Sequence, residues 1–176
     1  MVKYFCLFVL LTLTQSCYMF GKSFEISEKD YISNQIIVDF AKKMQKKGLH
    51  ACGLGGRVDK GKIMDFQIGF QYDHVLDISS ARRLMVETVL LFLDEINSNE
   101  AARKYLFHHP FTPNDVIITI YPDHSILSDQ DCIFSIIVDS SSGKIDYSVN
   151  DGIVNPLHTL QEESFTQAQE ILKSQK

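Results

Sequence analysis

The sequence predicts an α+β fold: a two-layer sandwich of about four mostly antiparallel strands, a long central helix, and flanking N- and C-terminal helices. Three observations lead to this prediction. Apolar and polar residues alternate strictly over residues 64–72, as in a strand with one buried face. Residues 84–96 are apolar nearly all round, which is typical of a buried helix. Residues 133–149 hold two strand-like runs around a turn at 140–143, which predicts a hairpin.

The first helix is expected to begin at Asp30, whose carboxylate can cap an N-terminus. Gly48 can end it, because glycine readily takes the left-handed conformation that follows many helices. The glycine-rich segment 48–56 is then expected to be a tight connection to the strand at 64–72. The apolar stripe of this helix contains Ile36, Ile37, Phe40, Ala41 and Met44.

The central helix is expected to be capped by Asp77 and to end near residue 97. A short helical piece at 100–106 follows, and the remaining strands are expected at 116–121, 133–138 and 145–149. Three consecutive strands favour an antiparallel meander with helices on one face. Because the central helix joins the first strand to the second, it can also be a crossover that makes part of the sheet mixed. A last helix has the apolar stripe Phe165, Ala168, Ile171 and Leu172.

The N-terminus resembles an export signal. Lys3 precedes an apolar run at 4–14 that is shorter than the roughly 20 residues needed to span a bilayer. Small residues then lead to Cys17 in a pattern similar to a bacterial lipobox. We therefore expect a signal peptide at 1–16, a tether at 17–29 and a single α+β domain at 30–176. The alternatives are cleavage near Ser16 or Ser23, giving a soluble exported protein, and a buried N-terminal element.

Lipidation at Cys17 would make membrane lipid a partner and anchor the domain in the bacterial envelope, facing the periplasm or the surface. Cys52 and Cys132 then remain as a possible disulfide, in a compartment that permits one. Alternatively, Cys52 is a nucleophile activated by a histidine, with His50 and His124 as the candidates. Histidines at such spacings are not specific to catalysis, so both readings stay open.

Composition and motifs argue against several other functions. The net charge of −5 disfavours a general nucleic-acid partner, which needs many Lys and Arg side chains to neutralise phosphates. The glycine-rich segment lacks both the helix that follows a phosphate loop and its Gly-Lys-Ser/Thr step. His50 and Cys52 are too closely spaced for a structural zinc pair, and Asp123, Asp129 and Asp131 lack the closing glutamate of a calcium loop. No cofactor and no metal site is predicted.

The segment Gly48-Leu49-His50-Ala51-Cys52-Gly53-x-Gly55-Gly56, with the long helix and residues 105–121 behind it, resembles small lipoproteins of chlamydia-like bacteria. The resemblance covers roughly residues 30–150. It implies an envelope protein, and that family has no assigned activity or catalytic residues to carry over.

These observations predict an exported, membrane-anchored binding domain without enzymatic activity. Its partner would be an envelope protein, a peptide or another envelope component. The first alternative is a cysteine-dependent hydrolase or thiol enzyme that uses Cys52 with a histidine. The second is a structural envelope protein that self-associates.

Overall fold

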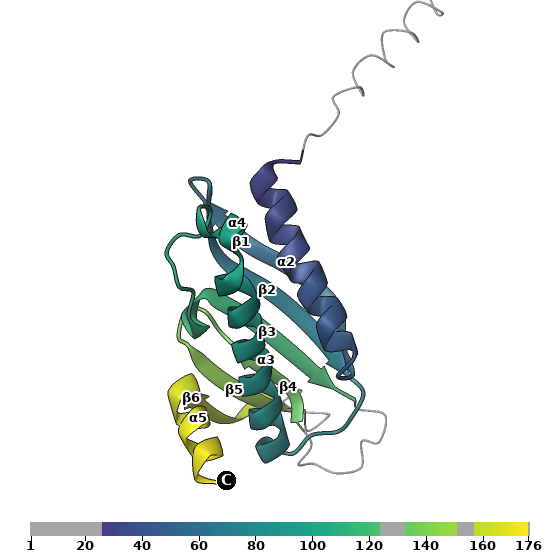
Figure 1. The fold of residues 1–176 in the computed structure, drawn as a ribbon. Coiled ribbons are helices and arrows are strands. Elements are labelled where there is room, and N and C mark those ends of the chain that lie inside the picture. Colours follow the sequence, from purple (N-terminus) through teal and green to yellow (C-terminus); the bar gives the residue numbers. More distant parts are fainter. Residues whose placement is uncertain (1–25, 124–132, 151–156, 176) are drawn as a thin grey trace, which may run out of the picture.

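A computed structural model describes residues 26–123, 133–150 and 157–175 (Figure 1). These residues form one six-stranded sheet with helices packed on one face. The strands are β1 (Leu49–Asp59), β2 (Lys62–Tyr72), β3 (Val116–Pro122), β4 (Ile133–Val138), β5 (Lys144–Val149) and β6 (His158–Ser164). The helices are α2 (Glu28–Gln45), α3 (Ile78–Ser98), α4 (Glu100–Arg103) and α5 (Phe165–Ser174), with a 3₁₀ turn at Pro113–Asp115.

The strands lie in the sheet in the same order as in the sequence, from β1 to β6. β2 and β3 are parallel, whereas every other neighbouring pair is antiparallel. The parallel pair arises because α3 crosses over between β2 and β3, as a parallel connection requires. The expected meander and crossover are therefore both confirmed, and β1 and β6 are the two edges of the sheet.

The core lies between the sheet and helices α2 and α3. Phe40 of α2 stacks on Phe92 of α3 with ring centroids 4.5 Å apart, and it meets Phe70 of β2 edge to face at 6.2 Å. Phe92 in turn contacts Phe66 of β2. Aromatic pairs in these geometries contribute about 0.5–1.5 kcal/mol beyond the area they bury. α2 therefore covers β1, α3 lies over β3 and β4, and their aromatic side chains meet above β2.

Two parts of the fold prediction were wrong, although the two-layer α+β class agrees with the structure. The sheet has six strands rather than about four, because both edge strands were missed. The expected connection at 48–56 is most of β1, an antiparallel partner of β2. No single helix is central, since α2 and α3 lie side by side over the sheet (Figure 1).

Polar side chains cap the N-termini of the helices, as expected, but the capping residue is not always the predicted one. Asp77 caps α3 by accepting a hydrogen bond from the Ser80 amide, as predicted. α2 begins earlier than predicted, because Ser27 and not Asp30 is its N-cap. Ser164 and Gln167 form a reciprocal capping box at the start of α5. Among the described residues, no helix combines the length and apolarity needed to cross a bilayer.

Candidate functional site

Strand β1 is an exposed edge with a free row of backbone groups. Among the described residues, its eleven residues pair only with β2, and Leu49 is the only one of the eleven that is fully buried. Leu54 and Val58 remain 53% and 47% exposed, although both are large and apolar. An edge of this length, with apolar side chains in view, is a template on which another extended chain can pair.

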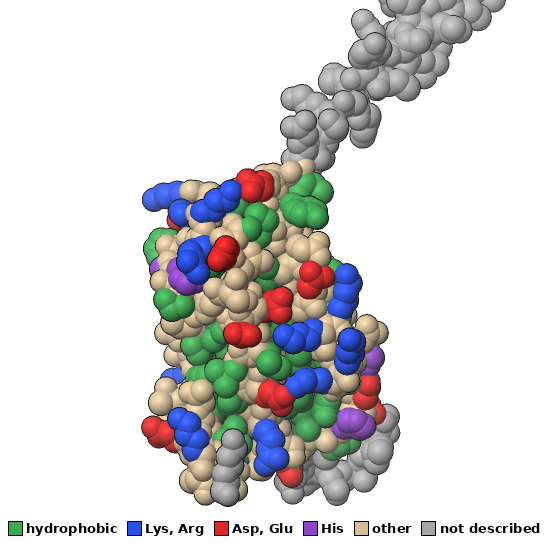
Figure 2. Space-filling view, viewed as in Figure 1, with side chains coloured by type: hydrophobic (Ala, Val, Ile, Leu, Met, Phe, Trp, Pro, Cys, Tyr) green, Lys and Arg blue, Asp and Glu red, His purple; other side chains and the backbone are tan. Residues whose placement is uncertain are grey.

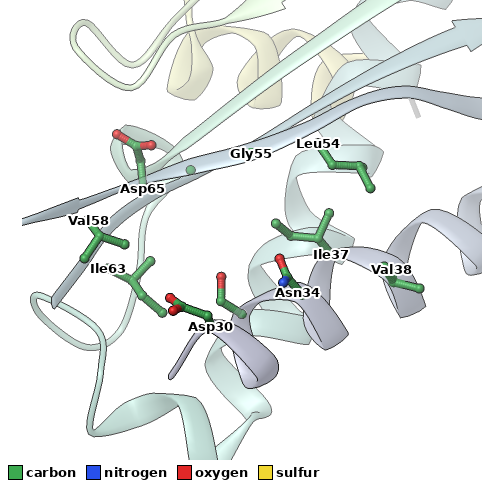
Figure 3. A pocket seen from close by; sticks show the side chains of 11 residues that line it. Asp30, Asn34, Ile37, Val38, Leu54, Gly55, Val58, Ile63 and Asp65 are labelled. Atoms are coloured by element: carbon green, nitrogen blue, oxygen red, sulfur yellow. The ribbon is translucent and has the colours of Figure 1, made fainter. Parts of the chain in front are cut away.

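A groove of about 600 Å³ runs between β1 and the N-terminal half of α2 (Figure 3). Leu54, Val58 and Ile63 line it from the strands, and Ile37 and Val38 line it from the helix. In Figure 3, Leu54 and Ile37 point into the space between strand and helix. The groove therefore has an apolar wall on each side and opens beside the unpaired edge of β1.

The helix side of the groove also carries polar groups, namely Asp30, Ser33 and Asn34. The Asp30 carboxylate accepts a hydrogen bond of 2.6 Å from the Ser27 hydroxyl and lies 3.1 Å from the Lys29 ammonium. The hydrogen bond from Ser27 lowers the pKa of Asp30, with Lys29 contributing less. Asp30 is therefore ionised at neutral pH and keeps one end of the groove hydrophilic.

A buried carboxylate fixes β1 against β2 beside the groove. Asp65 is only 2% exposed and accepts hydrogen bonds from the Arg57 amide at 3.0 Å and the Gln67 amide group at 3.3 Å. Its other oxygen lies 3.1 Å from the Arg57 guanidinium. At Gly56 the two strands approach so closely that a Cβ would lie 2.7 Å from the Asp65 carbonyl oxygen. The glycine at this position is thus required by the strand contact.

The structure places Cys52 and His50 on the same edge strand without joining them. The register of β1 shifts between Ala51 and Gly53, so Cys52 is the extra residue of a bulge, and its thiol is free and exposed. The His50 ring is 2.8 Å from Asp73, through its Nε2 atom. Within the described residues no hydrogen bond links His50 to Cys52.

The other predicted site residues, Cys17, His124 and Cys132, lie outside the described residues. Lipidation at Cys17, a disulfide between Cys52 and Cys132, and catalysis by Cys52 therefore stay predictions. The described residues also contain no group of three or more His, Cys, Asp or Glu side chains placed to hold a metal ion.

A buried polar cluster that the sequence did not predict lies at the other end of the sheet. Glu163 of β6 accepts hydrogen bonds from the Arg82 guanidinium at 2.7 Å and the Tyr147 hydroxyl at 2.5 Å. Arg82 and Glu163 are only 6% and 7% exposed. Burial, followed by the neighbouring Glu163, raises the pKa of Tyr147 far above its ordinary value. The cluster joins α3, β5 and β6, and its tyrosine stays protonated as a donor.

Comparison with known proteins adds no relative to this description. No family model matches the chain, and no similar protein was found among curated proteins or solved structures. The functional argument therefore depends on the geometry of the chain itself.

Proposed function

We propose that this protein is a binding domain that takes up an extended segment of a partner protein as an additional strand on β1. The observation that carries the proposal is the groove of about 600 Å³ beside the unpaired edge of β1. In binding of this kind, backbone hydrogen bonds to the edge provide affinity. Alternate side chains of the bound segment enter pockets and provide specificity.

The lining of the groove indicates what the bound segment would present. A strand added to β1 would direct every second side chain toward α2. Those side chains would meet Leu54 and Val58 from the strand and Ile37 from the helix, so apolar residues fit there. Asp30 and Asn34, at the N-terminal end of α2, favour a polar residue at that end of the segment.

A single extended segment fits this edge better than a second copy of the domain. Antiparallel pairing of two β1 strands would bring a second α2 to the same face of the joined sheet. The facing helix surfaces would include the polar groups of Asp30, Ser33 and Asn34 from both copies. A segment without a helix avoids burying these groups against one another.

The site of action is proposed from the N-terminal sequence. The resemblance of the N-terminus to an export signal, and the lipobox-like pattern before Cys17, support the proposal that the domain is tethered to a membrane in the bacterial envelope. An edge strand on a tethered domain would bind segments of other exported proteins. The thiol enzyme remains the alternative, and rapid alkylation of Cys52 near neutral pH would support it.

The test is selection of a phage-displayed library of random twelve-residue peptides on the full chain. Selected peptides are then synthesised and titrated by calorimetry. We expect Leu54→Lys to weaken binding by roughly tenfold or more, because a buried leucine contributes about 1.5–3 kcal/mol. Amides of β1 should gain hydrogen-exchange protection when the peptide is bound.

Leu160→Lys is the matched control. Leu160 lies on the opposite edge strand and is 46% exposed, close to the 53% of Leu54, so both variants should keep the wild-type melting temperature. The control should bind the peptides as the wild type does. Equal losses in the two variants, or a failure to select any saturable peptide, would overturn the proposal. A dimer that dissociates in Leu54→Lys would assign the edge to a second copy instead.

A further inference from the structure

A second cleft lies between α3 and α5, on elements that take no part in the β1 groove. It encloses about 540 Å³, within the range of roughly 300–1,000 Å³ typical of ligand pockets. α5 packs beside α3 (Figure 1), and the residues that line the cleft belong to these two helices and to Gln175, directly after α5. It is lined by Arg83, Val86, Glu87, Leu90, Gln169, Leu172, Lys173 and Gln175.

The middle of this cleft is apolar. Val86 is buried, and Leu172 packs against the core from α5. Leu90 is 45% exposed although it lies in a helix whose other apolar residues are mostly buried. Covering Leu90 would therefore remove a large apolar side chain from water, which favours an apolar occupant.

Two cations flank this apolar strip, Arg83 from α3 and Lys173 from α5. Within the described residues neither has an acid at ion-pair distance. Arg82, the residue next to Arg83, shows the contrast, because its guanidinium is 2.7 Å from Glu163 and is buried. Arg83 and Lys173 thus supply positive charge that no ion pair with another described residue neutralises.

The acids nearby do not cancel this charge. Glu87 lines the cleft, but its carboxylate pairs with Lys47, in the turn that follows α2. Glu170 lies on α5 and is exposed, outside the lining of the cleft. In the space-filling view of the helix-covered face, basic and acidic side chains are otherwise interspersed (Figure 2).

We infer that the cleft between α3 and α5 binds a single-chain amphiphilic anion, a long aliphatic carboxylate. The chain would lie over Val86, Leu90 and Leu172, and the carboxylate would meet Arg83 or Lys173 in a charge-assisted hydrogen bond. A partner helix fits less well, because α5 has ten residues and offers a wall only about 15 Å long. This inference is independent of strand addition at β1.

The test is a fluorescence titration of the full chain with undecanoic acid that carries a dansyl group. We expect saturable binding that oleate displaces. Arg83→Glu and Lys173→Glu should each weaken it by roughly tenfold, since a hydrogen bond between charged groups contributes about 1.5–3 kcal/mol. Both residues are exposed, so the variants should fold as the wild type does.

Arg103→Glu is the control, because it reverses the same charge on exposed α4, beyond the end of α3 that is remote from the cleft. It should change the affinity by no more than about twofold, since isolated surface charges act weakly at this range. An equal loss in Arg103→Glu would overturn the inference, as would equal affinity for the methyl ester of the probe. Binding to phosphatidylglycerol vesicles without binding of the free acid would assign the charge to a membrane surface instead.

Discussion

The two edges of the sheet expose backbone to very different extents. β1 has eleven residues, one charged residue between its ends and a groove beside it. β6 has seven residues, a register shift opposite Tyr147 and Ser148, and two adjacent glutamates. Short length, irregular register and inward-pointing charge are all devices that prevent another strand from pairing with an edge. β6 has all three. The register of β1 with β2 also shifts, at Cys52 and between Arg57 and Val58, but β1 is longer and none of its charged residues is buried.

The inward-pointing charge on β6 has a second consequence. Glu163 can be buried only because Arg82 and Tyr147 donate hydrogen bonds to it. The same group therefore closes the edge and ties β6 to α3. At the other edge the buried acid is Asp65, which lies on β2 and not on the edge strand itself. Its contacts with Arg57 hold β1 in place. β6 is thus a closed edge, which disfavours pairing with another strand. β1 is an open edge, held in a position where a partner strand can pair with it.

The largest expected effect comes from breaking the closed edge. Glu163→Ala should lower the free energy of unfolding by about 3–5 kcal/mol, because it leaves Arg82 buried without its partner. Glu162→Ala is the control, since the neighbouring Glu162 is exposed and pairs with Lys144, and it should cost no more than about 1 kcal/mol. Urea denaturation measures both. Similar costs for the two variants would show that the cluster does not stabilise this edge.

The next largest effect concerns the contact between β1 and β2. Alanine substitutions at two glycines of β1 should change the stability of the protein in opposite directions. Gly56→Ala should destabilise the protein by about 1–3 kcal/mol, because the new Cβ would meet the Asp65 carbonyl oxygen at 2.7 Å. Gly53→Ala should stabilise it by about 0.5–1 kcal/mol, since a Cβ there meets nothing within 4 Å and glycine weakens a strand. Thermal melts of the two variants measure both effects, and equal shifts in melting temperature would exclude the strand contact at Gly56 as the cause.

The comparison of the edges also explains what could be predicted from the sequence. β2 and β5 were predicted because they alternate apolar and polar residues, and β3 and β4 because they are short apolar runs between turn signals. β1 and β6 were missed. In β1, glycines at 53, 55 and 56 lack the side chains that would reveal a period of two. The segment therefore resembles a tight connection between a helix and a strand. In β6 the inward position is Glu163, a charge that no local pattern distinguishes from a surface acid.

The candidate site could not be predicted from the sequence either, because no local pattern indicates which distant residues meet there. Leu54 and Val58 are the large apolar residues that β1 contributes to the groove, and they form a site only when α2 lies beside them. The pairing of Glu163 with Arg82 spans 81 positions of sequence, so nothing local points to it. Cys52 and His50 were singled out for their chemistry, but folding leaves His50 bonded to Asp73.

A smaller, stabilising effect is expected at the turn that joins β1 to β2. Lys60 and Gly61 have φ values of 46° and 80°, so this two-residue turn needs the left-handed conformation twice. Lysine is strained there, whereas asparagine adopts it readily. Lys60→Asn should therefore raise the free energy of unfolding by about 0.5–1 kcal/mol without altering peptide binding at Leu54. Lys104→Asn, at another exposed lysine, should give no gain, and a gain in both variants would exclude the turn as the cause.

The smallest expected effect is the loss of stability of the first turn of α2, which forms one wall of the groove, at acid pH. The Tyr105 hydroxyl donates to Glu28 at 2.7 Å and the Lys104 ammonium lies 3.0 Å away, which fixes the first turn of α2. Tyr105 and then Lys104 lower the pKa of Glu28 below its ordinary value of 4.5. A lowered carboxylate pKa means that the stabilising contribution is complete above pH 4.5 and is lost as the pH falls through the folded-state value.

Hydrogen exchange of the first α2 turn in wild type and Glu28→Gln measures this contribution. The wild type should be the better protected at neutral pH, and the difference should vanish in acid once Glu28 is protonated. Glu170→Gln, an exposed acid on α5, should match the wild type throughout. A difference that persists in acid would mean that Glu28 acts through its shape rather than its charge. If acid instead loosens β6 before α2, the closed edge and not the open one depends on surface ionisation.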